Sequence, residues 1–283
     1  MNASQTGTAI LLTEWSAPSG ASSGRKLCDP LMPLLSKPLL QRSVEALVRL
    51  GCKQVHVFLG DHPAPVRELL GNGERWGVRL HYHYLQAEED LPHNLRRLRL
   101  DPTAHYWLAC DDRLPLRPEQ ADGDTAWYWQ EASARRHWAG LGRFRGNWLT
   151  ALRGCHDRRD FEARLMAAPA LQWRAAERPL SCESDADFLR SARVLLDSEP
   201  DSPPDRVHIG RGVVVHPTAV LTGPVWLGHL VHVGPGARLG PHAVLEDGAV
   251  VDQGAAIRHS VVVADTYVGQ ELNLHQCVAA PGR

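Results

Sequence analysis

Lysine is scarce in this chain of 283 residues: of the 31 basic residues only Lys26, Lys37 and Lys53 are lysines, and the others are arginines. The scarcity leaves few positions at which a catalytic lysine could lie. Neither sign of charge is in excess, because the formal net charge is -1. That balance indicates neither a nucleic-acid-binding surface nor an acidic tail.

Cysteine pairs and long apolar segments are also missing. The six cysteines are widely scattered and no two have C-x-x-C spacing, so neither a zinc site nor a disulfide framework is indicated. No apolar run reaches the length of about 18 residues that a membrane-spanning helix needs, and no basic segment followed by an apolar one opens the chain. These absences predict a soluble protein in the reducing cytoplasm, without membrane insertion.

The most regular feature of the sequence is an aliphatic residue at every sixth position between residues 209 and 263. A second apolar residue, usually small, follows four positions after each. A period of six fits neither a helix nor a simple alternating strand, but it fits a short strand and a tight corner, repeated. The aliphatic positions are Ile209, Val215, Leu221, Leu227, Val233, Leu239, Leu245, Val251, Ile257 and Val263.

This pattern resembles the hexapeptide repeat of left-handed parallel β-helices, in which three hexads make one triangular coil. The resemblance implies coils that stack and bury a continuous core between them. Beyond Val263 the register is expected to fail, because Gly269 takes the aliphatic position. Residues 272–280 are expected to form a capping turn or a final half coil.

The N-terminal part of the chain alternates apolar runs with helical patterns. Strand, helix, strand, helix, strand indicates βαβ units and a mostly parallel sheet. Strands are expected at 8–12, 55–59, 77–85, 106–110, 127–130 and 139–145, and helices at 38–50, 65–70, 91–100, 148–152, 161–166 and 185–196. The Pro- and Ser-rich residues 197–205 then predict a linker. We therefore expect an α/β domain at 1–196, a linker at 197–205 and a β-helix domain at 206–283.

Five segments in the first part of the chain resemble, in order, motifs of the sugar-1-phosphate nucleotidyltransferases, also called nucleoside-diphosphate-sugar pyrophosphorylases. Several of these enzymes carry a C-terminal left-handed β-helix. The resemblance implies a Rossmann-like nucleotidyltransferase domain that joins a sugar 1-phosphate to a nucleoside triphosphate, with Mg²⁺, and releases pyrophosphate. The segments are CDPLMPLLSKPLL (28–40), GNGERWGVRLHY (71–82), YWLACDD (106–112), WAGLGRF (138–144) and SDADFLRSARVLL (184–196).

The sequence departs from this family where the chemistry takes place. The phosphate loop G-x-G-T-R falls on residues 13–18, which contain neither glycine nor arginine, and the lysine of P-K-P falls on Asp29. The base-reading G-T-A-G turn falls on residues 91–94, LPHN, and the sugar-contacting asparagine falls on Trp138. Of the two metal-binding aspartates, the first matches Asp112 and the second falls near Ser181.

The candidate site residues follow from what remains. Asp111 and Asp112 end the strand at 106–110, at the edge of a parallel sheet where ligands bind. They are candidates for contact with a nucleotide or sugar, with Asp112 as the metal ligand, although the pair could instead cap the next segment. Lys37 matches a family position, and a solvated helix start explains it equally well. Arg25 and Lys26 are candidate catalytic residues that could restore the lost cationic charge.

Three functions are compatible with these residues. The favoured hypothesis is a degenerate nucleotidyltransferase, a pseudoenzyme that binds a sugar nucleotide or a partner enzyme and regulates the supply of polysaccharide precursors. The first alternative is an active, divergent nucleotidyltransferase that uses Arg25, Lys26 and Asp112. The second is a hexapeptide acyltransferase with a histidine base in the β-helix. In each case we expect a homo-oligomer formed through the β-helix or a complex with a related enzyme. The histidine candidates are His216, His229, His232, His242 and His259.

Overall fold

The computed structural model describes residues 7–13, 29–60, 63–84, 94–95, 97–130, 136–150, 155, 158–168, 171–176, 179–198, 203 and 205–281. The chain divides into two compact units. The first comprises Met1–Gly24 and Leu40–Pro179, and the second comprises Arg25–Leu39 and Leu180–Arg283. None of the helices in the described ranges is long and apolar enough to cross a membrane.

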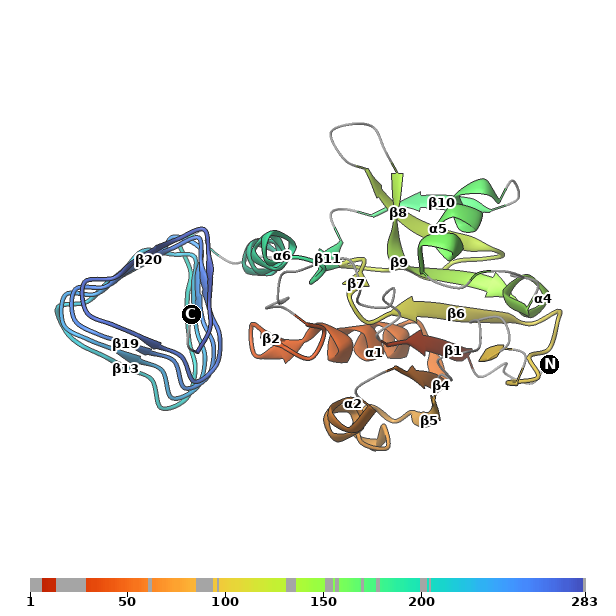
Figure 1. Ribbon diagram of the computed structural model, residues 1–283, viewed down its shortest axis with the longest axis horizontal. Helices are drawn as coiled ribbons and strands as arrows, with labels where there is room; N and C mark the ends of the chain where they lie inside the picture. Colours follow the sequence, from red (N-terminus) through yellow and green to blue (C-terminus); the bar gives the residue numbers. More distant parts are fainter. Residues whose placement is uncertain are drawn as a thin grey trace. The chain divides into compact units, whose positions relative to one another are not determined.

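The first unit is built on a sheet with the strand order β10-β8-β9-β6-β1-β4-β5 (Figure 1). β1 pairs in parallel with both β4 and β6, and β4 with β5, while β9 is antiparallel to β6 and to β8. The predicted mostly parallel sheet is confirmed, and β10 is an addition that the sequence did not reveal. The strands are β1 (Gly7–Leu12), β4 (Cys52–Leu59), β5 (Arg79–Tyr84), β6 (His105–Cys110), β8 (Thr125–Gln130), β9 (Arg136–Arg145) and β10 (Gln172–Ala175).

The longest helix of the first unit buries one apolar face. In α1 (Leu39–Arg49), Leu40, Val44 and Leu47 are all 0% exposed, and their spacing of four and three residues places them on one face. Gly51 stops the helix with a left-handed φ of 88°, which glycine adopts without strain. The others are α2 (Pro63–Leu70), η1 (Glu74–Trp76), α4 (Gly146–Thr150) and α5 (Arg158–Ala167), and the two-residue strand β7 (Arg113–Leu114) follows β6.

The prediction of a helix at 91–100 is wrong for the second half of that range. Asn94 and Leu95 are helical, but residues 97–100 form a turn and an irregular segment. Leu98 and Leu100 both pack on the core cluster, and Arg99 between them has a left-handed φ of 48°. That conformation turns both leucines to the same core, which a continuous helix could not do for residues two apart. Residues 91–93 and 96 lie outside the described residues.

The second unit contains three parallel sheets that wind in a triangular coil (Figure 1), as in a left-handed parallel β-helix. Their strand orders are β12-β15-β18-β21-β24, β13-β16-β19-β22 and β14-β17-β20-β23. The strands are β12 (Val207–Ile209), β13 (Val214–Val215), β14 (Val220–Leu221), β15 (Val225–Leu227), β16 (His232–Val233), β17 (Arg238–Leu239), β18 (Ala243–Leu245), β19 (Val250–Val251), β20 (Ala256–Arg258), β21 (Val261–Val262), β22 (Tyr267–Val268), β23 (Asn273–His275) and β24 (Val278–Ala279).

The inward aliphatic residues stack on one another from coil to coil. Leu227 pairs with Leu245 and Leu239 pairs with Ile257 in the next coil. All four side chains are at most 1% exposed. Ala237, Ala243, Ala249 and Ala255 occupy the small positions of the hexads and are 0% exposed, so the corners leave no room for larger side chains. The predicted hexad core is therefore confirmed from Leu227 to Ile257, whereas Ile209 in the first coil is 56% exposed.

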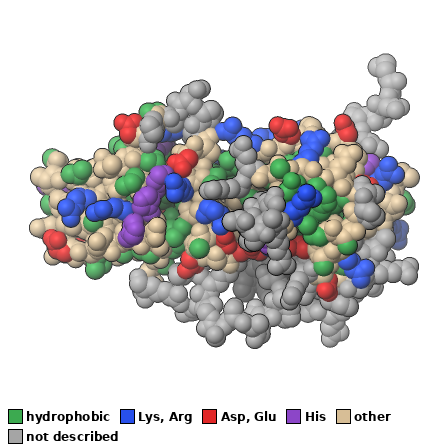
Figure 2. Space-filling view, turned by 90° about the horizontal axis from the view of Figure 1, so that it is seen from above, with side chains coloured by type: hydrophobic (Ala, Val, Ile, Leu, Met, Phe, Trp, Pro, Cys, Tyr) green, Lys and Arg blue, Asp and Glu red, His purple; other side chains and the backbone are tan. Residues whose placement is uncertain are grey.

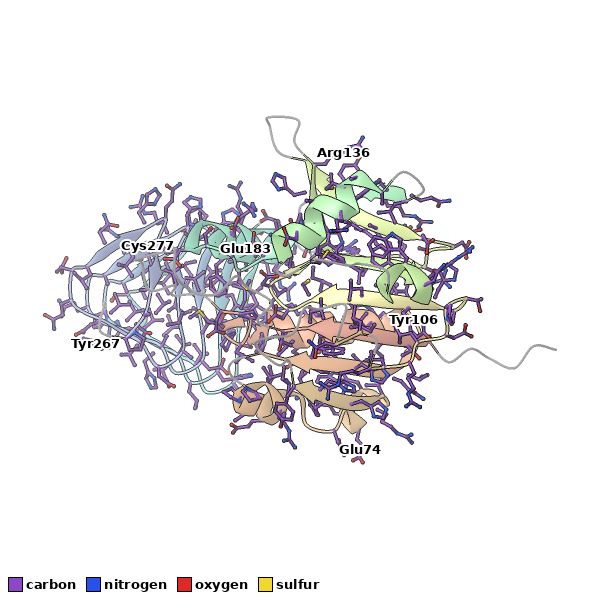
Figure 3. The ribbon with its side chains drawn as sticks, turned by 45° about the vertical axis from the view of Figure 1, so that its right-hand side comes forward. Glu74, Tyr106, Arg136, Glu183, Tyr267 and Cys277 are labelled. Atoms are coloured by element: carbon purple, nitrogen blue, oxygen red, sulfur yellow. The ribbon has the colours of Figure 1, made fainter. Side chains whose placement is uncertain are left out.

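The register then shifts by one residue. Leu245 pairs with Val262, Val251 with Val268 and Ile257 with Leu274. Val262 is 0% exposed, so it takes the inward position that we predicted for Val263. Tyr267, next to the inward Val268, points outward (Figure 3) and is 63% exposed.

The prediction of one unbroken register that ends at Val263 is thus wrong, and so is the capping turn or half coil at 272–280. β23 closes the fourth coil and β24 opens a fifth. After the shift, Ser260 and Thr266 take the small positions, at 0% and 4% exposure. Their hydroxyls donate to the carbonyl oxygens of Arg258 and Ala264. Polar side chains are therefore tolerated in the core because each is hydrogen-bonded.

A hairpin from the N-terminal half of the chain is attached to the β-helix by a buried carboxylate. β2 (Pro33–Leu34) and β3 (Lys37–Pro38) form a hairpin, and Leu35 and Ser36 form its turn with φ angles of 52° and 57°. The backbone N–H groups of Leu35 and Ser36 donate to the Glu246 carboxylate at 2.6 and 2.9 Å, and Glu246 is 0% exposed. Two charge-assisted hydrogen bonds offset the cost of burying this carboxylate.

The last helix also belongs to the second unit. α6 (Asp185–Asp197) follows the short strand β11 (Leu180–Ser181) and begins at Ser184, whose hydroxyl accepts from the Asp187 N–H at 3.1 Å. At its end, Asp197 accepts a hydrogen bond from His242 Nε2 at 3.0 Å. The helix expected at 185–196 is confirmed. The domains expected at 1–196 and 206–283, with a linker at 197–205, stay a prediction.

We predict that Leu245→Ala lowers the free energy of unfolding of the β-helix by about 2–5 kcal/mol, because it leaves a cavity between coils on both sides. Val220→Ala is the matched control, since Val220 is 53% exposed. It should change stability by no more than about 0.5 kcal/mol. Chemical denaturation followed by circular dichroism measures both, and equal effects would contradict the stacking of inward residues.

Candidate functional site

The carboxyl ends of β1 and β6 form a polar edge in the first unit. Leu12 and Cys110, the last residues of these parallel strands, are paired. Thr13 follows β1 and is 0% exposed, while Asp111 and Asp112 follow β6 at 5% and 6% exposure. The Asp111 N–H donates to the Leu12 carbonyl oxygen at 3.1 Å, so the aspartate pair begins beside the end of β1. Both aspartates therefore lie at the strand ends, as we expected.

Hydrogen bonds from neighbouring elements fix this edge. The Thr13 hydroxyl donates to the carbonyl oxygen of Phe58, near the end of β4, at 2.9 Å. The Ser43 hydroxyl of α1 donates to the carbonyl oxygen of Cys110 at 3.2 Å. The ends of β4, β1 and β6 are thus held together, and the aspartate pair starts from a rigid backbone.

Arg113, the cationic residue that follows the aspartate pair in the sequence, has a structural role. Arg113 is 8% exposed and its guanidinium donates to the Trp138 carbonyl oxygen at 3.0 Å. The same nitrogen lies 3.3 Å from a carboxylate oxygen of Glu162 in α5. A buried guanidinium that is paired in this way contributes little positive charge to a bound phosphate.

Trp138 is a core residue. It is 0% exposed, its indole N–H donates to the Leu141 carbonyl oxygen at 2.9 Å, and its ring centroid lies 5.1 Å from that of Phe161. The nucleotidyltransferases that the sequence resembles have a sugar-contacting asparagine at this position. An indole buried between β9 and α5 cannot contact a sugar from there.

Of the remaining positions, Lys37 and Asp29 are among the described residues. Lys37 is exposed in β3, which belongs to the second unit. Asp29, also in the second unit, accepts hydrogen bonds from the N–H groups of Leu31 and Met32 at 2.6 and 3.0 Å, so its carboxylate caps a turn. Arg25 and Lys26 lie outside the described residues, as do residues 14–18 of the expected phosphate loop.

The residues present do not fit the Mg²⁺ site of the enzymes that the sequence resembles. Within the described ranges, no group of three or more His, Cys, Asp or Glu side chains could hold a metal ion. Mg²⁺ prefers carboxylate oxygens in a near-octahedral set. Where the second aspartate is expected, Ser181 is 4% exposed and its neutral hydroxyl lies in the second unit.

Sequence reasoning missed a histidine cluster on the sheet. The parallel register of β4 and β5 places His56 opposite His81. The His56 ring stacks on His81 at a centroid distance of 5.1 Å, and His56 Nδ1 lies 2.9 Å from His83 Nε2. Burial, followed by repulsion from His83 and His81, lowers the pKa of His56 to about 4. Only the strand register, which the sequence does not contain, brings His56 to the other two.

A cleft of about 360 Å³ opens beyond β7 in the first unit. Arg117, Glu119, Trp127 and Arg174 contribute to its lining. The Arg174 guanidinium donates to the Gln120 carbonyl oxygen at 3.0 Å and lies 6.0 Å from the centre of the Trp127 ring. The size is in the range of small-molecule sites, and no sequence motif marked it.

Comparison with known proteins defines the class of the fold. No protein-family model and no curated protein match the sequence. The chain is similar to a solved structure from Bacillus anthracis, with a TM-score of 0.53 and 11% sequence identity. That structure is described as a putative glucose-1-phosphate thymidylyltransferase in complex with a sucrose. The similarity covers 69% of this chain and 98% of that one. The chain therefore shares the fold of a sugar-1-phosphate nucleotidyltransferase and continues into a β-helix.

We predict that Trp138→Asn, which introduces the residue expected of a sugar-binding relative, lowers the free energy of unfolding by about 3–5 kcal/mol. The cause is the loss of a fully buried indole and its hydrogen bond. The control is Trp76→Asn, because Trp76 is half-buried under Arg75 and should cost about 1 kcal/mol or less. Urea denaturation measures both. A stable Trp138→Asn protein would show that this position is free to contact a ligand.

Proposed function

We propose that this protein is a nucleotidyltransferase-fold protein of sugar-nucleotide metabolism that binds a sugar nucleotide and has lost most of the chemistry of nucleotidyl transfer. The observation that carries the proposal is the buried Asp111–Asp112 pair beside Thr13, at the ends of β6 and β1. Carboxylates at this edge can accept hydrogen bonds from sugar hydroxyls. In open α/β sheets, ligands bind beyond the carboxyl ends of the strands.

The loss of catalysis follows from the charge that the reaction requires. Joining a sugar 1-phosphate to a triphosphate brings several negative charges together, and cations and metal must stabilise them. The expected phosphate loop has no glycine or arginine, and Asp29 replaces the expected lysine. Arg113 is paired with Glu162. Each lost cation costs about 3 kcal/mol of transition-state stabilisation, so several losses lower the rate by orders of magnitude.

The role we infer is regulatory. A protein that binds a sugar nucleotide without consuming it can report the supply of polysaccharide precursors to a partner enzyme. The homo-oligomer expected through the β-helix stays a prediction, which a monomer at every concentration in sedimentation velocity would contradict.

The alternatives have less support. An active, divergent nucleotidyltransferase would depend on Arg25, Lys26 and Asp112 with Mg²⁺. A hexapeptide acyltransferase would need a histidine base, yet three of the candidate histidines have hydrogen-bond partners in their own or the neighbouring coil. His216 bonds Thr218, His229 accepts from the Arg211 N–H, and His232 lies 3.1 Å from the Leu230 carbonyl oxygen.

The binding prediction is tested by a thermal-shift screen of nucleotides and sugar nucleotides, with and without Mg²⁺. A ligand at about a hundredfold excess over its Kd should stabilise the protein by about 2.7 kcal/mol. Asp112→Asn should weaken binding about tenfold, because it removes a charge-assisted hydrogen bond. Asp122→Asn is the matched control, since Asp122 is exposed in the same unit.

Two further results would contradict the proposal. Pyrophosphate release from a nucleoside triphosphate and a sugar 1-phosphate, abolished by Asp112→Asn, would show an active enzyme. Arg174→Gln separates the two candidate places in the first unit. If this change weakens binding while Asp112→Asn does not, the ligand lies in the cleft beyond β7 and not at the strand ends.

A further inference from the structure

Three histidines meet at one corner of the β-helix, and we call them the histidine column: His242, His259 and His275. His242 and His259 are corner residues with φ angles of 53° and 49°. Their rings are stacked with a centroid distance of 5.3 Å and an interplanar angle of 18°. The His275 ring meets His259 edge-on at 5.6 Å. Figure 2 shows a continuous run of histidine side chains on the β-helix, with arginine side chains on either side.

The charged groups around the column are distributed unevenly. Asp197 of α6 lies at one end, where it accepts from His242 Nε2 at 3.0 Å and pairs with Arg193 at 3.7 Å. Among the described residues, the charged groups that act on His259, in the middle of the column, are His242, His275, Arg193 and Arg258. Burial, and then repulsion from these four groups, lowers the pKa of His259. Basic groups therefore surround the middle of the column, while the Asp197 carboxylate lies at one end.

The available donors suit an anion with several acceptor oxygens. His259 and the exposed His275 offer imidazole N–H groups from neighbouring coils. Nε2 of His242 is bonded to Asp197, and its Nδ1 is buried without a hydrogen-bond partner among the described residues. Arg258 is exposed at the end of β20, one residue before His259. Imidazolium and guanidinium groups together form short, charge-assisted bonds to phosphate oxygens.

We propose that the histidine column and Arg258 form a binding site for a phosphate group, either free or carried by a larger molecule. The site lies on the β-helix, and it is independent of sugar-nucleotide binding at the ends of β1 and β6. A bound phosphate replaces the repulsion among the basic groups with attraction. Binding and protonation of the histidines are therefore linked, and phosphate must bind more tightly to the protonated column.

The sign of this linkage can be measured on the whole protein. The imidazole C–H signals are titrated by NMR from about pH 5 to about pH 8. This range includes the usual histidine pKa of about 6.5. One series contains inorganic phosphate and the other chloride at equal ionic strength. Phosphate should raise the pKa of His259 by about one unit, which corresponds to about tenfold tighter binding to the protonated form.

Two arginines provide a matched pair of variants. Arg258→Gln should abolish most of the phosphate-dependent rise in the His259 pKa. Arg238→Gln is the control, because Arg238 is exposed on the same sheet, in the preceding coil, and does not act on His259. Both changes are on the surface, so the fold should be retained. An equal response in the two variants would overturn the site.

A third series separates the two sources of phosphate. A nucleoside monophosphate and inorganic phosphate should both shift His259 if the phosphate group alone is recognised. A response to the nucleoside monophosphate only would support a site for a larger phosphate ester. If the His259 pKa is the same in phosphate, nucleoside monophosphate and chloride, the proposal is wrong, whatever the outcome of the sugar-nucleotide screen.

Discussion

The stacking of each inward aliphatic side chain on its equivalent in the next coil is the constraint on which the second unit depends. A coil alone has too few residues to bury its own interior, so neighbours must stay in register. Leu227 on Leu245 and Leu239 on Ile257 show this register directly. The same stacking holds Glu246 at a corner, where its carboxylate receives the turn of the β2–β3 hairpin.

The hexad period predicted most of this architecture, and its error in register has a physical cause. Val261, Val262 and Val263 are consecutive valines, so the sequence fits an unbroken period of six as well as a shift by one. Only the pairing of Val262 with Leu245 shows which of the two registers the protein adopts. Ser260 and Thr266, which do not read as core residues, fill small buried positions because their hydroxyls bond backbone carbonyls of their own corners.

In the first unit, the order of strands and helices could be predicted because each has its own periodicity. The placement of Asp111 and Asp112 followed from the rule that parallel strands present their carboxyl ends at one edge. The pairing of Arg113 with Glu162 and the approach of His56 to His83 could not be predicted. Both depend on which side chains face each other across elements, and neither residue pair forms a motif in the sequence.

The chain thus retains the sheet of a nucleotidyltransferase while its polar groups have taken structural roles. Arg113 stabilises the core, Asp29 caps a turn and Trp138 fills the space between β9 and α5. The hairpin that follows the position of the P-K-P-L-L segment is bound to the β-helix by Glu246. The sheet is therefore that of the nucleotidyltransferase fold, whereas Arg113, Asp29 and Trp138 are held in structural contacts.

Amide hydrogen exchange with and without a saturating sugar nucleotide tests this account most directly. The account predicts slower exchange in residues 105–113, at the end of β6 and the aspartate pair, and no change in residues 225–279 of the β-helix. Unchanged exchange at 105–113, in the presence of a ligand that stabilises the protein, would contradict it.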